Sequence, residues 1–362
     1  MRKKVYFIAF IFALFIVSAL YVNSAESFVI ESPLHLMAES VTDDDTGETS
    51  IILMFTSPES VKQLGEKSLT EGDSLYYEVE YKTSGSDWEP VGRLHFSEGE
   101  MLVITDSDQS LDIANKLYSF RVRFAYHILK SDDSFLPCYS LYSNIAHIGD
   151  RSALGSYQNA SPWAVQELDR ALEYGLITDK IRGNMNAPIT REEFCGVIMA
   201  LYESMAGKVD CDDTGIFLDT DNLQVCKAYK LGIVNGVGNN LFDPDALTNR
   251  EQVAAMIYRA IKVMLPYMDF STSGADNFSD KSDISEWAYE PVMFMSRNGL
   301  LKGSNGKADP KGVTTREQAV LMVVRTYEKF GLSGVVASKE TGIDASSLPM
   351  QNDSPGSFIV GN

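Results

Sequence analysis

Apolar and polar side chains alternate along several short runs between about residues 30 and 150. A period of two is typical of antiparallel β-strands with one buried face. We predict strands at 50–56, 75–82 and 118–126, separated by turns rich in Gly, Ser and Asp. Within 118–124 every second residue is apolar and the residues between are polar or cationic, which predicts that one face packs and the other meets water.

The second half of the chain carries a four-residue signature three times, as Thr190-Arg-Glu-Glu, Asn249-Arg-Glu-Gln and Thr315-Arg-Glu-Gln. Thr or Asn followed three residues later by Glu or Gln is a capping box, which fixes the N-terminus of a helix. Apolar residues then recur at helical spacing after each box. We therefore predict a helix after each signature.

A shorter helix ending in glycine is predicted upstream of each signature, at 163–175, 220–232 and 287–299. The later two loops, 236–244 and 303–310, contain glycine turns and a proline, which keep the two helices of a unit from fusing. Each unit is therefore predicted to be a helix, a loop and a second helix.

Composition adds size and charge to this picture. The chain has 362 residues, of which 44% are hydrophobic, enough for two or three domains with cores of their own. Its 31 Lys and Arg against 50 Asp and Glu give a net charge of −19. That charge argues against nucleic-acid or anionic-membrane binding, so any anionic ligand must be met by local cations.

The first residues predict export. Three cations at 2–4 precede an apolar run at 5–22, and the small residues Ser24 and Ala25 follow. We interpret 1–25 as a secretory signal peptide. The apolar run is also just long enough for an uncleaved membrane anchor, which is the alternative and the one predicted link to a membrane.

The cysteines and acidic loops do not predict a metal or a cofactor. Cys211 and Cys226 are the nearest pair of the four cysteines, but their spacing does not establish a bridge, and none is predicted. The segment 210–215 is similar to the start of a calcium loop, yet Asp221 is a poor substitute for the closing glutamate, so we interpret it as a linker. We find no phosphate loop, nucleophile elbow or His-Glu-x-x-His motif in the sequence and predict no enzyme activity.

The first half resembles a fibronectin type III domain over residues 26–150, on Tyr77-Glu-Val-Glu-Tyr-Lys, Trp88, Tyr118-Ser-Phe-Arg-Val-Arg and Tyr142-Ser-Asn. The resemblance implies an all-β sandwich in which the Tyr118 hydroxyl ties the chain back to a neighbouring backbone group. Two departures are Phe55 in place of a core tryptophan and a long loop at 61–73. Such sandwiches serve as spacers or interaction modules.

The three helical units resemble S-layer homology repeats, the wall-anchoring modules of Gram-positive and related bacteria. The resemblance implies an all-α bundle with pseudo-threefold symmetry, whose grooves between repeats bind pyruvylated secondary cell-wall polysaccharide. The predicted divisions are repeat one at 151–208, repeat two at 209–268, repeat three at 269–330 and a flexible tail at 331–362.

The resemblance implies that Arg191, Arg250 and Arg316 contact the acidic ketal of that polysaccharide. An arginine in the first helical turn lies beside free backbone N–H groups and the positive end of the helix dipole. Its planar fork also suits bidentate binding of a carboxylate. The alternative is that each arginine pairs with a neighbouring Glu or Asp on the surface.

Four further residues complete the candidate ligand-binding set: Trp163, Trp287, Asp219 and Asp280. The tryptophans open the first helices of repeats one and three, two residues after a serine that could cap each helix. Burial between helices is the favoured interpretation for them, and sugar stacking is the alternative. The aspartates belong to Phe-x-Asp segments of repeats two and three.

Repeat two lacks the tryptophan, and repeat one lacks the Phe-x-Asp segment and has a shortened loop. The three grooves are therefore predicted to differ, with the groove that involves repeat one the doubtful one.

The sequence as a whole predicts an exported, non-catalytic bacterial protein at the cell wall or S-layer surface. Two alternatives remain open at this point. The sandwich could make the chain an adhesin for a protein or glycan partner, or its carboxylates could make it a small cell-wall glycoside hydrolase.

Overall fold

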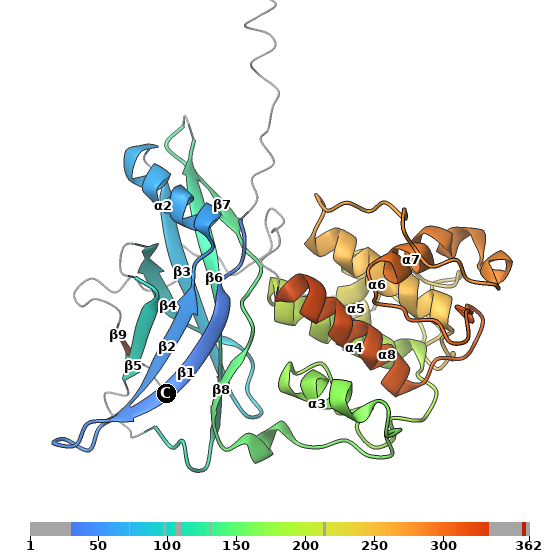
Figure 1. The fold of residues 1–362 in the computed structure, drawn as a ribbon, viewed down its shortest axis with the longest axis horizontal. Coiled ribbons are helices and arrows are strands. Elements are labelled where there is room, and N and C mark those ends of the chain that lie inside the picture. Colours follow the sequence, from blue (N-terminus) through green and yellow to red (C-terminus); the bar gives the residue numbers. More distant parts are fainter. Residues whose placement is uncertain are drawn as a thin grey trace, which may run out of the picture.

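The computed structural model describes residues 30–71, 73–96, 99–105, 111–130, 132–212, 215–332 and 357–359. A β-sheet part and a helical part lie side by side (Figure 1). The predicted signal peptide at 1–25 lies outside the described residues, as does most of the predicted tail. Within that tail, residues 357–359 form a short strand.

Two sheets make up the β part. One has the strand order β1-β2-β5-β9, and the other has the order β4-β3-β6-β7 with β8 also paired to β6. Neighbouring strands are antiparallel except β9, which runs parallel to β5. The elements are β1 (Leu34–Thr42), β2 (Thr49–Thr56), α2 (Glu59–Glu71), β3 (Ser74–Thr83), β4 (Glu89–His95), β5 (Met101–Thr105), β6 (Leu117–Leu129), β7 (Phe135–Tyr139), β8 (Ala146–Gly149) and β9 (Ser357–Ile359).

The three strands predicted from alternation are present as β2, β3 and β6. The Tyr118 hydroxyl accepts a hydrogen bond of 3.2 Å from the backbone N–H of Asp112, which is a backbone tie of the expected kind. The long predicted loop is instead helix α2. Val61 and Leu64, three residues apart, face the core between the sheets and explain why this segment is helical.

The polar face of β6 does not meet water, and this part of the prediction is wrong. Arg121 and Arg123 are 0% and 1% exposed. Each pairs with the glutamate directly opposite on β3: Arg121 Nε donates to Glu80 at 2.7 Å and Arg123 Nε donates to Glu78 at 2.8 Å. Alternation gave the correct period, but the helical part covers the face expected to be solvated.

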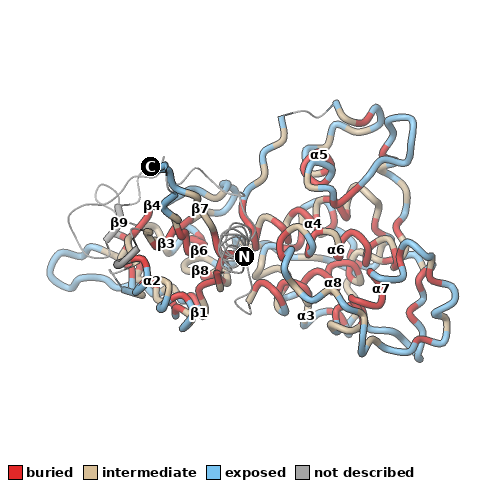
Figure 2. Tube along the Cα trace, turned by 90° about the horizontal axis from the view of Figure 1, so that it is seen from above, coloured by how far each residue is buried: buried red, intermediate tan, exposed pale blue. Residues whose placement is uncertain are grey.

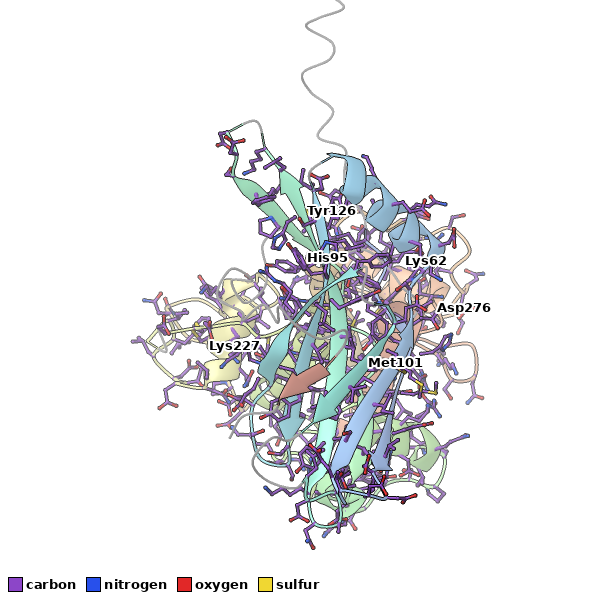
Figure 3. The ribbon with its side chains drawn as sticks, turned by 90° about the vertical axis from the view of Figure 1, so that its left-hand side faces the viewer. Lys62, His95, Met101, Tyr126, Lys227 and Asp276 are labelled. Atoms are coloured by element: carbon purple, nitrogen blue, oxygen red, sulfur yellow. A yellow bond between two sulfur atoms is a disulfide. The ribbon has the colours of Figure 1, made fainter. Side chains whose placement is uncertain are left out.

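This face of β6 takes part in the contact between the two parts. Arg121 donates to the backbone carbonyl of Glu203 in the helical part, and the Tyr142 N–H donates to Met205 O at 2.8 Å. The Arg121 guanidinium also lies 3.9 Å from the centroid of the Tyr142 ring. Lys227, labelled in Figure 3, is buried beside this contact and pairs with the Glu203 carboxylate at 2.6 Å.

The helical part consists of three pairs, each with a first helix followed by a longer or similar second one. Buried residues (red in Figure 2) follow α4, α6 and α8, whose facing sides share one hydrophobic core. Among the described residues, none of the helices combines the length and hydropathy needed to cross a membrane. The helices are α3 (Val165–Glu173), α4 (Arg191–Ala206), α5 (Leu223–Lys230), α6 (Arg250–Met264), the 3₁₀ turn η3 (Lys281–Asp283), α7 (Glu286–Arg297), α8 (Arg316–Thr326) and the π turn η4 (Tyr327–Gly331).

All three predicted capping boxes are formed, at Thr190, Asn249 and Thr315. The residues just before these boxes join in a closed ring of backbone hydrogen bonds. Ile189 N donates to Thr314 O at 3.0 Å, Thr314 N donates to Thr248 O at 2.9 Å and Thr248 N donates to Ile189 O at 3.1 Å. The three pairs are therefore related in cyclic order.

Cys211 and Cys226 form a disulfide, which the sequence analysis did not predict. The bridge ties the segment before α5 to α5 itself. The two cysteines are 15 positions apart in the sequence, and the fold brings their Cα atoms to 6.2 Å, which the sequence spacing alone did not reveal.

Candidate functional site: grooves between neighbouring helix pairs

Each signature arginine is the first residue of its helix and reaches across to the loop of the next pair. This order is cyclic, since the helix of the third pair reaches the loop of the first. Capping fixes where the helix starts, so it also fixes where the guanidinium lies. The contacts are Arg191 Nε to Phe242 O at 2.9 Å, Arg250 Nε to Ala308 O at 2.8 Å and Arg316 Nη1 to Asn184 O at 3.1 Å.

The glutamate that follows each arginine also joins two pairs, which the sequence analysis missed. Its carboxylate accepts hydrogen bonds from a hydroxyl residue near the start of another pair's first helix. Its presence in all three signatures was the signal that could have revealed this role. The contacts join Glu192 to Thr220 at 2.8 Å, Glu251 to Ser285 N at 3.0 Å and Oγ at 2.9 Å, and Glu317 to Ser161 N and Oγ, both at 2.8 Å.

Ser161 and Ser285 therefore do not act as the side-chain caps that the sequence suggested. Ser285 occupies the N-cap position of α7, but its side chain makes no capping bond and donates to Glu251 instead. The N-cap of α3 is Ala164, three residues after Ser161. These serines hold helix pairs together across the bundle.

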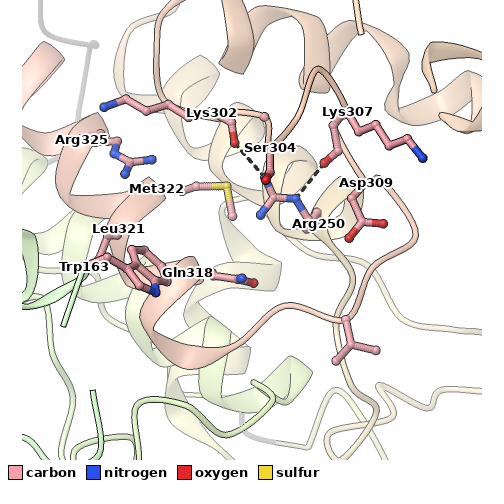
Figure 4. Close-up of a pocket in the computed structure, with 13 residues that line it drawn as sticks. Trp163, Arg250, Lys302, Ser304, Lys307, Asp309, Gln318, Leu321, Met322 and Arg325 are labelled. Atoms are coloured by element: carbon pink, nitrogen blue, oxygen red, sulfur yellow. Dashed lines mark hydrogen bonds between the residues drawn. The ribbon is translucent and has the colours of Figure 1, made fainter. Parts of the chain in front are cut away.

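A cavity of about 420 Å³ surrounds Arg250. Figure 4 shows its guanidinium beside the loop of the third pair, with Trp163 and Gln318 on the opposite wall. The other charged lining residues are Lys302, Lys307, Asp309 and Arg325. Arg325 forms a bidentate ion pair with Glu167 at 2.7 and 2.8 Å, so Arg250, Lys302 and Lys307 are the lining cations that remain to balance Asp309 in a chain of net charge −19.

The Arg250 guanidinium has no carboxylate within ion-pair distance among the described residues. Its Nε and Nη2 groups donate to the backbone carbonyls of Ala308 at 2.8 Å and Lys302 at 3.2 Å. Burial lowers the pKa of Arg250 below its usual value, and the nearby Asp309 opposes that shift. The cation is partly desolvated by loop carbonyls, so an incoming anion would be favoured here.

Arg191 resembles Arg250 in these respects. Among the described residues it also lacks an ion-pair partner, and its guanidinium carbon lies 4.5 Å from the centroid of the Phe242 ring. Burial lowers its pKa as well, with Asp243 among the groups that oppose the shift.

Arg316 differs from both. It forms a bidentate ion pair with Glu193, with Nε donating to Oε2 at 3.2 Å and Nη2 donating to Oε1. The two side chains are only 17% and 13% exposed. Arg316, which contacts the loop of the first pair, thus pairs with a glutamate as in the alternative interpretation, but the pair is largely buried and not on the surface.

The tryptophans are exposed, contrary to the favoured interpretation of burial between helices. Trp163 and Trp287 are 58% and 54% exposed. Trp163 precedes the first turn of α3, and the smaller Ala164 and Leu168 fill the core position instead. Its ring is thus left on the wall of the groove.

Asp219 and Asp280 bind the backbones of the loops of the second and third pairs. Asp219 accepts from the backbone N–H groups of Phe242 and Asp243, and Asp280 accepts from those of Ala308 and Asp309, all at 2.8 Å. Partial desolvation raises the pKa of each carboxyl, but these backbone donors outweigh it and hold the pKa below its usual range. Both carboxylates shape the loops whose carbonyls the arginines contact.

The part of the chain that the structure describes contains no cluster of His, Cys, Asp and Glu arranged to hold a metal ion. The cavity around Arg250 is lined by cations, by residues of the third pair's loop and by the exposed Trp163.

The model of the S-layer homology domain matches residues 224–254 and 277–320, which include Arg250, Arg316 and Trp287. An amylopullulanase of Thermoanaerobacterium thermosulfurigenes is 32% identical over 151 residues, or 40% of this chain and 8% of that protein. The exoglucanase XynX of Acetivibrio thermocellus is 30% identical over 147 residues, or 39% of this chain and 13% of that protein.

The surface-layer 125 kDa protein of Lysinibacillus sphaericus is 24% identical over 217 residues, or 57% of this chain and 17% of that protein. The chain therefore spans less than a fifth of the length of each of these relatives. The helical part of the chain contains S-layer homology sequence, and the proteins similar to it include one named for a surface layer.

Proposed function

We propose that this chain is an exported, non-catalytic cell-surface protein that is held to the wall by its helical part. Its ligand is an anionic secondary cell-wall polysaccharide, whose pyruvyl ketal carboxylate binds in the grooves between helix pairs. The observation that carries the proposal is Arg250, a partly buried cation with no carboxylate of its own among the described residues, in a groove walled by the exposed Trp163.

The groove offers what a ketal carboxylate on a sugar would need. The Arg250 guanidinium supplies a planar pair of donors, and its position at the start of α6 adds the positive end of the helix dipole. Lys302 and Lys307 raise the local potential. The flat face of Trp163 matches the apolar face of a sugar ring, which aromatic side chains cover with little entropic cost.

The cyclic contacts support a bundle in which three repeats act as one unit. The backbone ring at Ile189, Thr248 and Thr314 joins all three pairs, so no pair would hold its groove alone. Each groove is assembled from neighbouring pairs, and one pair in isolation should not bind.

For the β part we propose a fibronectin type III-like spacer or interaction module. The orders β1-β2-β5 and β4-β3-β6-β7, in which neighbouring strands are antiparallel, support that likeness. Hydrogen bonds from Arg121 to Glu203 O and from the Tyr142 N–H to Met205 O attach the second of these sheets to the helical part. The module would therefore project from the wall in a fixed orientation, with its other faces available to a protein or glycan partner.

The test is co-sedimentation of the chain, without residues 1–25, with bacterial wall sacculi before and after mild acid removes ketal-linked pyruvate. Arg250→Ala is compared with Arg297→Ala, since Arg297 is a surface arginine paired with Asp269 at 2.7 Å. We expect pelleting of the native chain and the Arg297 variant on native walls alone, and clearly reduced pelleting of Arg250→Ala. Equal pelleting in every case, or in none, would contradict the proposal.

The same sacculi test the non-catalytic role. Soluble reducing sugar is measured after prolonged incubation with the native chain. We expect no release above the level of sacculi alone, and a sustained release would move the assignment to a wall hydrolase.

A further inference from the structure

Arg316 has the same place in the cyclic order of the helix pairs as Arg250, but a carboxylate already contacts its guanidinium. We infer that Glu193 occupies the acid-binding position of this groove, so that the chain has two working grooves and a third that is closed from within. The identity of the ligand in this inference rests on the proposed function, whereas the closure of the third groove rests on the ion pair between Arg316 and Glu193.

The closure depends on one position of the four-residue signature. The last residue of the facing helix's signature lies near each groove arginine, as Gln318 lies in the cavity of Arg250. By the cyclic order of the pairs, Gln252 takes this place opposite Arg191 and Glu193 takes it opposite Arg316. Both glutamines are neutral, and only the glutamate can neutralise the arginine.

The contact of Glu193 with Arg316 is the one expected of a bound carboxylate. Two nitrogens of the guanidinium each donate to one carboxylate oxygen, and both side chains are largely shielded from water. An external acid would have to displace Glu193 and leave that carboxylate shielded without its partner. Such an unpaired charge is costly, so the native ion pair excludes the ligand.

The aromatic wall is missing from the same groove. In the groove of Arg250, the aromatic wall is Trp163, which lies two residues after Ser161, the residue that hydrogen-bonds to Glu317. Beside Arg316 the corresponding hydrogen bond joins Glu192 to Thr220, and the residue two positions after Thr220 is Asn222. The Asn222 side chain accepts from Gln224 N at 2.8 Å and caps α5. Neither charge nor stacking surface is left for a sugar acid.

Glu193→Gln is the decisive variant, because glutamine already completes the capping boxes of α6 and α8. The substitution should keep the start of α4 while releasing Arg316. The matched control is Glu193→Gln combined with Arg316→Ala, which removes both partners.

The first measurement is calorimetric titration of the chain without residues 1–25 with the methyl glycoside of a pyruvylated hexose, and with the same glycoside lacking pyruvate. We expect Glu193→Gln to add a further binding equivalent and the double variant to return to the native value. No added equivalent in Glu193→Gln, or an added equivalent that persists in the double variant, would overturn the inference.

A second measurement needs no glycan and separates this inference from the proposed function. The Nε–H resonance of Arg316 is followed by NMR hydrogen exchange in the free chain. We expect slow exchange that becomes at least about tenfold faster in Glu193→Gln, because a hydrogen bond to a charged group contributes roughly 1.5–3 kcal/mol. Equal exchange in both chains would refute the closure, even if the grooves of Arg191 and Arg250 bind the glycoside.

Discussion

Arginine side chains lie both at the contact between the two parts and in the groove of Arg250, but they have different surroundings in the two places. At the contact, Arg121 and Arg123 lie opposite glutamates of β3 in register, and each arginine is buried in an ion pair. In the groove, Arg250 meets loop carbonyls and the neutral Gln318. The difference teaches that the supply of a carboxylate partner determines whether an arginine stabilises the fold or remains available to an external acid.

Arg316 connects the two cases, since it has the position of a groove arginine and the partner of a structural one. Variants can test the comparison by removing either partner. Removal of a glutamate should leave an arginine without its ion-pair partner, and removal of the Arg250 guanidinium should lower ligand affinity with little effect on the free energy of unfolding.

The largest effect is expected from Glu80→Ala, which leaves Arg121 buried without its partner. Breaking a buried ion pair by removing one member costs about 3–5 kcal/mol. Urea unfolding of the chain measures the loss. Glu89→Ala on the neighbouring strand is the control, because Glu89 is exposed and should change the free energy of unfolding by about 0.5 kcal/mol or less. Similar losses in both variants would show that the buried pair has no special role.

The second-largest effect concerns the planar guanidinium of Arg250. Arg250→Lys keeps the charge but loses the planar pair of donors, so affinity for the pyruvylated glycoside should fall about tenfold, equivalent to roughly 1.4 kcal/mol. Calorimetric titration measures it, with Arg297→Lys as the control outside the groove. Unchanged affinity of Arg250→Lys would mean that charge alone suffices.

A smaller loss is expected from Trp163→Ala. Stacking of an aromatic ring contributes roughly 0.5–1.5 kcal/mol, so affinity should fall by about two- to tenfold. The free energy of unfolding should hardly change, because the ring is 58% exposed. A double-mutant cycle with Arg250→Lys reports their coupling, and additive losses would indicate that the two side chains do not share one ligand.

The smallest effect concerns pH. The pKa values of Asp219 and Asp280 are held below the ordinary value of 3.8, so their ionised forms stabilise the folded loops. That contribution is complete above the pKa of the unfolded chain and is lost as pH falls through the lower folded value. We expect the amide resonance of Ala308 to keep its shift at pH 4 and to move at more acidic pH. In Asp280→Asn this acid transition should disappear, and its persistence would exclude Asp280 as the cause.

Local chemistry made part of this molecule predictable. The capping boxes at Thr190, Asn249 and Thr315 depend on residues three positions apart, and all three helices begin where they predicted. The period of two located β2, β3 and β6 for the same reason. Propensity and spacing are sufficient when both partners of an interaction are near in sequence.

The rest depended on partners far apart in sequence. Nothing in the alternation of β6 showed that the helical part would bury Arg121, since the contacting Glu203 is 82 residues away. The exposure of Trp163 depends on how α3 packs against α8, and the pairing of Glu193 with Arg316 spans 123 residues. The doubt about the repeat-one groove came from its missing Phe-x-Asp segment and its short loop, whereas the structure shows a different feature there, the pairing of Arg316 with Glu193.

The central claim is that an arginine without a carboxylate partner is where the ligand acid binds. A crystal structure of the chain without residues 1–25, grown with the pyruvylated glycoside, tests it most directly. We predict the ligand carboxylate within hydrogen-bond distance of the Arg250 guanidinium, with its sugar against Trp163 and the pair of Arg316 with Glu193 intact. A ligand carboxylate bound to Arg316, or bound away from all three arginines, would contradict the account.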